Sequence, residues 1–272
     1  MTDLHRRKLI LALGAGLVAV PAYALAEGGV EHAEGAPKPR PKRKPVAKKP
    51  AAAAPAAEPH AAAAHDAAPS VPPEEAMTRL MSGNARYCAG LSAHPHANAV
   101  RRIEVATGQH PFAVILACAD SRVAPELIFD QGLGDLFVVR VAGNVVDDAT
   151  LASIEYAVIH LGATLIMALG HERCGAVKAT AEALAGRGSP DDKDTRIGAL
   201  AALIAPAVRA VPTGAADPLD AAVSLNAAHA AAEVFAGSPP LRKRVLAGSL
   251  KIVAARYDLD DGRVSPTKSQ PV

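Results

Sequence analysis

The sequence has no tryptophan, and aromatic residues make up only 3% of its 272 positions. Single-stranded nucleic acids are bound largely by stacking their bases on aromatic side chains, so no nucleic-acid-binding surface is expected. Cysteine is also scarce, and the three cysteines cannot all pair in disulfides within one chain. Half of the residues are nevertheless hydrophobic, which is enough for a domain with a substantial core.

A large net charge is absent too, and the small excess of +2 is unevenly distributed. Residues 1–73 contain ten Lys and Arg against six Asp and Glu, whereas residues 74–272 contain nineteen against twenty-one. The basic character therefore belongs to the first part of the chain and not to the part with globular composition.

The start of the chain has the pattern of an export signal. It contains the twin pair Arg6 and Arg7, then the apolar run Leu9–Val20, then small residues. This apolar run is too short to span a bilayer comfortably, which disfavours a membrane anchor. We therefore predict a signal peptide over residues 1–26 that directs the protein to the periplasm by the twin-arginine route.

Residues 27–73 are rich in Pro, Ala and Lys and contain few large apolar side chains. Such a segment cannot bury enough surface to offset the entropy lost on ordering, so we predict a disordered, extended linker. Its basic cluster KPRPKRK could make a weak contact with an anionic surface, although a solvated spacer is the simpler interpretation.

The folded domain is expected over residues 74–272. Its pattern predicts an α/β domain with a mainly parallel central sheet flanked by helices, and with an N-terminal helical arm. Continuous apolar runs predict buried strands at 112–117, 136–142, 164–170 and 250–257. Helical periodicity predicts helices at 75–87, 97–107, 150–162, 176–186, 195–208 and 219–237. Sites in parallel α/β domains lie beyond the carboxyl ends of the strands.

Two of these strand ends carry reactive side chains, CADSR after the first strand and GHERCG after the third. A disulfide would suit an exported protein, but a domain with this much core does not need one. A cysteine nucleophile with His171 as its base leaves the second cysteine unexplained. A zinc ion explains Cys118, His171 and Cys174 together, and three protein ligands leave a fourth position open, as in catalytic zinc sites.

Asp120 and Arg122 stand next to the first ligand in the sequence. Asp120 is the one nearby residue that could close the site as a fourth ligand. Arg122 could hold its carboxylate in a charge-assisted pair, which would keep the site open.

The residues around these motifs are expected to be structural. Cys88 should be a small buried side chain of the first helix. Gly170 and Gly175 should avoid crowding in the turn, and Glu172 and Arg173 should face solvent.

Together, ACADSRV and GHERCGAV resemble the paired motifs of the β-class carbonic anhydrases, and IEYAVIHLG and YDLDDGRV extend the resemblance. The resemblance implies that Cys118, His171 and Cys174 bind one Zn²⁺ per chain, and that Asp120 and Arg122 form a catalytic dyad. It also implies a substrate pocket of the plant-type branch, lined by Gln109, Phe137, Ala142 and Tyr156. Another branch uses a tryptophan in a regulatory bicarbonate site, so that control is not expected here.

The activity implied is the hydration of CO2 to bicarbonate and a proton by attack of a zinc-bound hydroxide. Two thiolates cancel the charge of the metal, so we expect kcat/KM to rise with pH from near neutral. The resemblance also implies a homodimer or higher even oligomer with shared pocket residues, in which the first helix contacts a neighbour. The alternatives are a COS or CS2 hydrolase on the same fold, a non-catalytic zinc-binding protein and a thiol-redox protein.

Overall fold

The computed structural model describes residues 70–192 and 194–267, which all belong to one compact unit. The predicted signal peptide and residues 27–69 of the predicted linker lie outside the described residues, so both stay predictions. Among the helices that are described, none is both long and apolar enough to cross a membrane.

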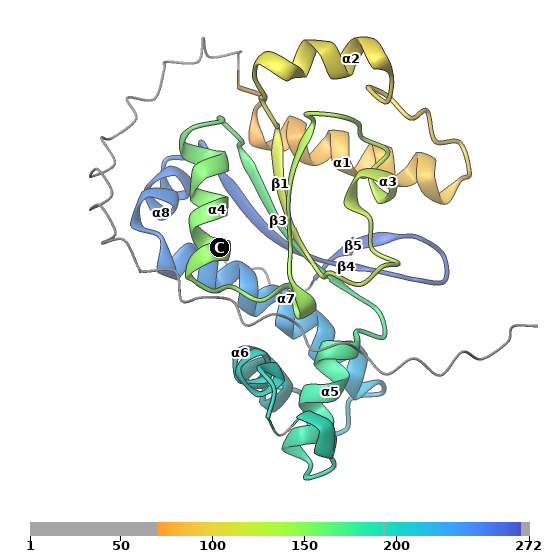
Figure 1. The fold of residues 1–272 in the computed structure, drawn as a ribbon, viewed down its shortest axis with the longest axis vertical. Coiled ribbons are helices and arrows are strands. Elements are labelled where there is room, and N and C mark those ends of the chain that lie inside the picture. Colours follow the sequence, from red (N-terminus) through yellow and green to blue (C-terminus); the bar gives the residue numbers. More distant parts are fainter. Residues whose placement is uncertain (1–69, 193, 268–272) are drawn as a thin grey trace, which may run out of the picture. The chain divides into compact units, whose positions relative to one another are not determined.

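A five-stranded sheet forms the centre of the domain, in the order β2-β1-β3-β4-β5 (Figure 1). The strands are β1 (Ala113–Ala117), β2 (Leu136–Arg140), β3 (Leu165–His171), β4 (Lys251–Tyr257) and β5 (Val264–Pro266). The first four run parallel, and β5 is antiparallel to β4. The predicted mainly parallel sheet is thus confirmed. The sequence analysis missed β5 because three residues are too few to establish a hydrophobic period.

Helices pack on both faces of this sheet (Figure 1). They are α1 (Pro73–Cys88), α2 (Ala99–Glu104), α3 (Pro125–Ile128), α4 (Asp148–Ile159), α5 (Gly175–Leu184), α6 (Ile197–Arg209), α7 (Pro218–Gly237) and α8 (Pro239–Leu246). The six predicted helices are present, although α2 is shorter than 97–107 and continues as a 3-10 turn. Helices α3 and α8 were not predicted from the sequence. Helix α8 starts at Pro239 behind the cap Ser238, since proline is well tolerated in the first turn of a helix.

Both faces of β1 are buried, which explains its continuous apolar run. Successive side chains of a strand point to opposite faces, so Val114 and Leu116 join one apolar cluster and Ile115 joins the other. Each fully buried aliphatic side chain stabilises the fold by about 2 kcal/mol. This packing on two sides fixes β1, and with it the residues that follow its carboxyl end.

The N-terminal helical arm consists of α1 and α2. Helix α1 packs on its own sheet through Ala76 and Leu80, whereas α2 buries no residue. Contact of the first helix with a neighbouring subunit stays a prediction. Cys88 was expected to be buried and is exposed instead, because it is the last residue of α1, beyond the buried part of that helix.

Candidate metal centre

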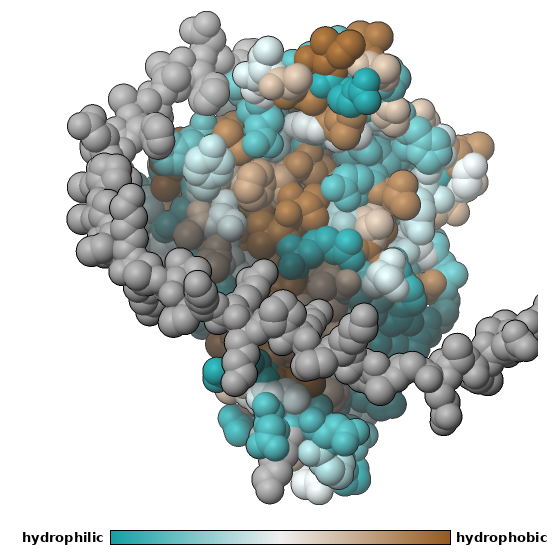
Figure 2. All heavy atoms as spheres, viewed as in Figure 1, coloured by the Kyte–Doolittle hydropathy of each residue, from teal (hydrophilic) through white to brown (hydrophobic). Residues whose placement is uncertain are grey.

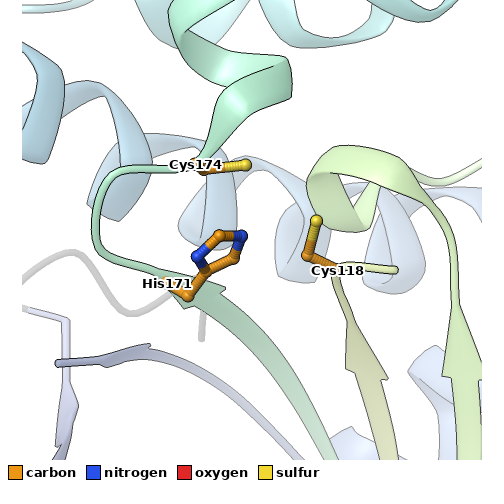
Figure 3. Close-up of side chains that lie close together, drawn as sticks. All are labelled: Cys118, His171 and Cys174. Atoms are coloured by element: carbon orange, nitrogen blue, oxygen red, sulfur yellow. The ribbon is translucent and has the colours of Figure 1, made fainter. Parts of the chain in front are cut away.

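Three side chains from different elements point toward one another at the carboxyl ends of β1 and β3 (Figure 3). Cys118 directly follows β1, His171 ends β3, and Cys174 precedes α5. All three are buried, and one ligand atom of each lies within 4.8 Å of the others. They meet because β1 and β3 are adjacent parallel strands, as the sequence predicts.

The turn between β3 and α5 directs two of these side chains to one point. Arg173, in its middle, has a φ of 53°, so the chain reverses there in the left-handed region. The Glu172 N–H donates to the carbonyl of Tyr257 at 2.9 Å, which holds the turn against β4. His171 and Cys174 therefore reach the same space from a turn of only a few residues.

The two glycines beside the turn do not have the predicted role. A Cβ on Gly170 would lie 3.1 Å from the Val223 carbonyl oxygen, so glycine there allows α7 to approach β3 closely. A Cβ on Gly175 would meet nothing within 4 Å. The expectation that side chains at these positions would crowd the turn is wrong, because the close neighbours of Gly170 belong to α7 and Gly175 has none within 4 Å.

One of the two charged residues of the turn also differs from the expectation. Arg173 is exposed, as predicted. Glu172 is only 19% exposed, and its carboxylate lies 3.1 Å from Arg173 and 3.6 Å from Arg256. It also accepts the N–H of Leu259. The prediction that Glu172 faces solvent is wrong because these partners tie it to the end of β4.

His171 is prepared to bind a metal. Its Nδ1 lies 2.9 Å from the Glu172 carbonyl oxygen, which can only accept, so Nδ1 carries the proton. Its Nε2 then has a free lone pair, and this fully buried atom has no hydrogen-bond partner among the described residues. A buried nitrogen without a partner, facing two cysteine sulfurs, fits the ligand chemistry of zinc.

Cys118 is held by hydrogen bonds that favour its thiolate form, the form that binds a metal. The Gly143 N–H donates to Cys118 Sγ at 3.2 Å. Hydrogen bonding with the Cys174 side chain lowers the pKa of Cys118, and the same contact raises the pKa of Cys174. The pair therefore shares a proton, which a metal must displace to bind both sulfurs as thiolates.

Asp120 lies beside the ligands, and Arg122 holds it firmly. Arg122 Nε donates to Oδ1 at 2.9 Å, Nη2 to Oδ2 at 2.7 Å, and its backbone N–H to Oδ1 at 3.0 Å. These hydrogen bonds hold the pKa of Asp120 well below its ordinary range. Asp120 Oδ2 remains 3.9 Å from His171 Nε2, so the carboxylate borders the ligand set while its oxygens are held by Arg122.

Two residues that hold this loop and the neighbouring Gly143 were not predicted from the sequence. Arg140, the last residue of β2, donates from Nε to the carbonyl of Cys118 at 3.1 Å and from Nη2 to that of Asp120 at 2.7 Å. Buried Asn226 of α7 donates to the carbonyl of Gly143 at 2.7 Å. The sequence signals that could have identified them are the charge of Arg140 at the end of the apolar run LFVVR and the polar Asn226 within an alanine-rich helix.

Comparison with known proteins identifies the family. The family described as carbonic anhydrase matches residues 113–264, more than half of the chain. Carbonic anhydrase 2 of Mycobacterium tuberculosis is 43% identical over 198 residues, which cover 72% of this chain and 93% of that protein. The chain belongs to the carbonic anhydrase family.

Solved structures show that its fold is that of the β class. A tetrameric β-carbonic anhydrase of Sordaria macrospora aligns with a TM-score of 0.54 and 26% identity, covering 71% of this chain and 96% of that one. The Coccomyxa β-carbonic anhydrase in complex with acetazolamide aligns with a TM-score of 0.53 and 26% identity, covering 70% and 85%. The β-class resemblance read from the paired motifs is therefore confirmed.

The four predicted pocket residues of this carbonic anhydrase do not gather around its own metal ligands. Ala142 adjoins Gly143, close to Cys118. Phe137 pairs in register with Val114 near the start of β1, and its ring lies 6.5 Å from that of Tyr156. Gln109 is exposed and precedes β1. It therefore lies near the amino ends of the parallel strands, whereas the ligands lie at the carboxyl ends. Within one chain, only Ala142 of the four adjoins the site.

Proposed function

We propose that this protein catalyses the reversible hydration of CO2 to bicarbonate and a proton. The observation that carries the proposal is the buried, unpartnered Nε2 of His171, which faces two cysteine sulfurs beside a clamped carboxylate. Membership of the carbonic anhydrase family supports the same reaction.

Cys118, His171 and Cys174 would hold one Zn²⁺ per chain. When bound, zinc supplies a Lewis acid that makes a water molecule a stronger acid near neutral pH. The hydrogen bond from His171 Nδ1 to the Glu172 carbonyl fixes the ring, so that only Nε2 can serve as the ligand atom.

Asp120 would accept a hydrogen bond from the attacking water at Oδ2, the carboxylate oxygen nearer to His171. Arg122 keeps Asp120 ionised and prevents it from turning toward the ligands, because it binds both carboxylate oxygens. The two residues therefore orient the nucleophile while leaving space for it. Half of the Arg122 side chain is exposed, so this side of the candidate site faces solvent.

We also propose that the chain works as a homodimer or a higher even oligomer. Strand β2 is an outer strand of the sheet, and an exposed edge strand is normally covered. Val100 and Ile103 of α2 are 65% and 68% exposed, and apolar surface gathers over α2 in Figure 2. In such an assembly, Gln109, Phe137 and Tyr156 would complete the pocket of a neighbouring subunit.

Export to the periplasm is proposed from the sequence alone. The twin-arginine pattern of residues 1–26 supports it, and a basic linker over 27–73 would leave the enzyme free to make a weak contact with an anionic surface. Replacing Arg6 and Arg7 by lysine should retain the protein in the cytoplasm, as detected by cell fractionation. Unchanged export of that variant would contradict this route.

The activity is tested by stopped-flow CO2 hydration on the purified protein from Glu27 onward, with zinc measured in the same sample. We expect about one zinc per chain and fast hydration that a chelator abolishes. A rise of kcat/KM between about pH 6 and pH 9 would agree with two thiolate ligands. Zinc without hydration, followed by turnover of COS, would replace the proposal with the hydrolase alternative. A zinc-free, oxidisable Cys118–Cys174 pair would replace it with the redox alternative.

A further inference from the structure

Helix α7 is connected to the metal centre through two hydrogen bonds in series. Asn226 is 2% exposed, and its Nδ2 donates to the Gly143 carbonyl oxygen at 2.7 Å. The Gly143 N–H donates in turn to Cys118 Sγ at 3.2 Å. Asn226 itself has no place among the predicted ligands or the dyad, so its role is separate from theirs.

Gly143 is held in a conformation that few residues can adopt. Its φ is 69°, and a Cβ at this position would lie 2.6 Å from Ile204 Cδ1 of α6. Gly143, whose N–H donates to the sulfur, is therefore packed closely against Ile204 of α6 and Ala176 of α5 and has no side chain of its own to anchor it. Among the described hydrogen bonds, the one side-chain donor to its carbonyl oxygen is Asn226.

We propose that Asn226 is a positioning residue of the metal centre. By holding the Gly143 carbonyl, it restricts the backbone torsions of Gly143, which keeps the Gly143 N–H directed at Cys118 Sγ and sets how strongly this thiolate binds the metal. The inference rests on the proposed zinc site, and it adds a residue of α7 to the determinants of that site.

The physical reason lies in the charge of the sulfur. An N–H donor stabilises negative charge on a thiolate, which changes the electron density that the sulfur gives to a metal. It also restricts the orientation of the Cys118 side chain before the metal arrives. Loss of Asn226 should therefore loosen the sulfur and remove the donor from it, although no ligand atom is changed.

A matched control is available in Asn84, the buried asparagine of α1. It is 3% exposed and donates to the carbonyls of Ile128 and Gly262, while its Oδ1 accepts the N–H of Val264. These partners belong to a different part of the domain from the metal ligands. Asn84→Leu therefore removes a comparable buried amide and leaves the hydrogen bonds from Asn226 to Gly143 and from Gly143 to Cys118 unchanged.

The experiment compares Asn226→Leu with Asn84→Leu in the full chain. Asn226 borders a cavity of about 260 Å³, which offers room for the leucine side chain. Each protein is loaded with Co²⁺ to record the sulfur-to-metal charge-transfer band, and zinc affinity is measured by chelator competition. In Asn226→Leu we expect a shift of the band to lower energy and about tenfold weaker zinc binding. In Asn84→Leu we expect neither change.

A wild-type band and affinity in Asn226→Leu would overturn the inference, as would equal changes in both variants. If Asn226→Leu does not fold, Asn226→Ala removes the same donor without adding apolar bulk, and the same outcomes decide. The wild-type protein separates this inference from the proposed function. If the wild type binds neither metal, the proposed function fails. If the wild type binds metal and hydrates CO2 while the variants match it, only the role of Asn226 fails.

Discussion

At the scale of single residues, Arg122 determines the orientation and the ionisation state of Asp120. Arg122 supplies three hydrogen bonds to Asp120 and occupies both of its carboxylate oxygens. The low pKa that results keeps Asp120 an acceptor at all moderate pH values. The sequence predicted this pair because the two residues are only two positions apart, and no long-range contact is needed to form it.

We predict that Arg122→Ala lowers kcat/KM for CO2 hydration by at least about 100-fold while zinc stays bound. Without its clamp, Asp120 can turn toward the metal ligands and no longer orients a water molecule. Stopped-flow hydration and zinc analysis on the same sample measure both effects. The control is Arg173→Asn, which removes an equally exposed arginine beside the ligands and tolerates the positive φ there. Zinc loss from Arg122→Ala would show a structural role instead.

Arg140 gives a second prediction at this scale. Its two donors hold the carbonyls of Cys118 and Asp120, so Arg140→Leu should loosen the loop and weaken zinc binding about tenfold. Arg140→Lys should recover only part of the affinity, because one ammonium group cannot reproduce the planar fork. Chelator competition measures the three affinities. Wild-type affinity in Arg140→Leu would exclude this role.

At the scale of elements, a buried carboxylate joins α1 to the segment that leads to α2. The Asp130 side chain is fully buried and accepts hydrogen bonds from Arg86 Nε at 2.6 Å, from the Ala93 N–H at 2.9 Å and from the His94 N–H at 2.8 Å. Burial raises the pKa of this carboxyl group, but the three hydrogen bonds outweigh it and the net pKa is lowered. Asp130 thereby fixes the path of the chain toward α2, which carries the exposed apolar side chains.

We predict that Asp130→Asn lowers the free energy of unfolding by about 2 kcal/mol at pH 7. Since the folded-state pKa of Asp130 is depressed, its contribution is complete above the unfolded pKa of about 4 and is lost as the pH falls through the folded value. The difference between wild type and variant should therefore shrink as the pH is lowered below about 4. Denaturant unfolding at several pH values measures it, and a difference independent of pH would contradict the assignment.

At the scale of the whole molecule, the fold separates three of the four predicted pocket residues from the candidate metal ligands. Gln109 lies at the amino edge of the sheet and Phe137 near the start of β2, while the ligands lie at the carboxyl edge. This separation is fixed by the parallel register of the strands. It favours an assembly in which pocket residues of one subunit serve another.

We predict that the wild-type protein sediments as a dimer or larger even oligomer, and that Ile103→Glu shifts it toward monomer. A charge on α2 would have to be desolvated in the interface, which disfavours association. The control is Leu246→Glu on α8, a 74% exposed leucine outside the proposed interface. Sedimentation velocity measures the three proteins. An unchanged oligomer in Ile103→Glu, or equal dissociation of the control, would place the interface elsewhere.

Local sequence patterns determined much of this protein. Continuous apolar runs predicted four strands and helical periods predicted six helices. The two reactive motifs predicted that Cys118, His171 and Cys174 lie together and that Arg122 binds Asp120. These features depend on residues close together in the sequence or on a rule that applies to every parallel sheet, namely that carboxyl ends of adjacent strands meet.

Tertiary structure alone decided the features that depend on distant partners. The roles of Arg140 and Asn226 arise from hydrogen bonds to carbonyl groups far away in the sequence, and a carbonyl group carries no signal of its own in the sequence. The burial of Glu172 and the exposure of Cys88 likewise depend on where β4 and α1 end. Local periodicity reports which face of an element is apolar, but only the packed chain determines which group stands opposite it.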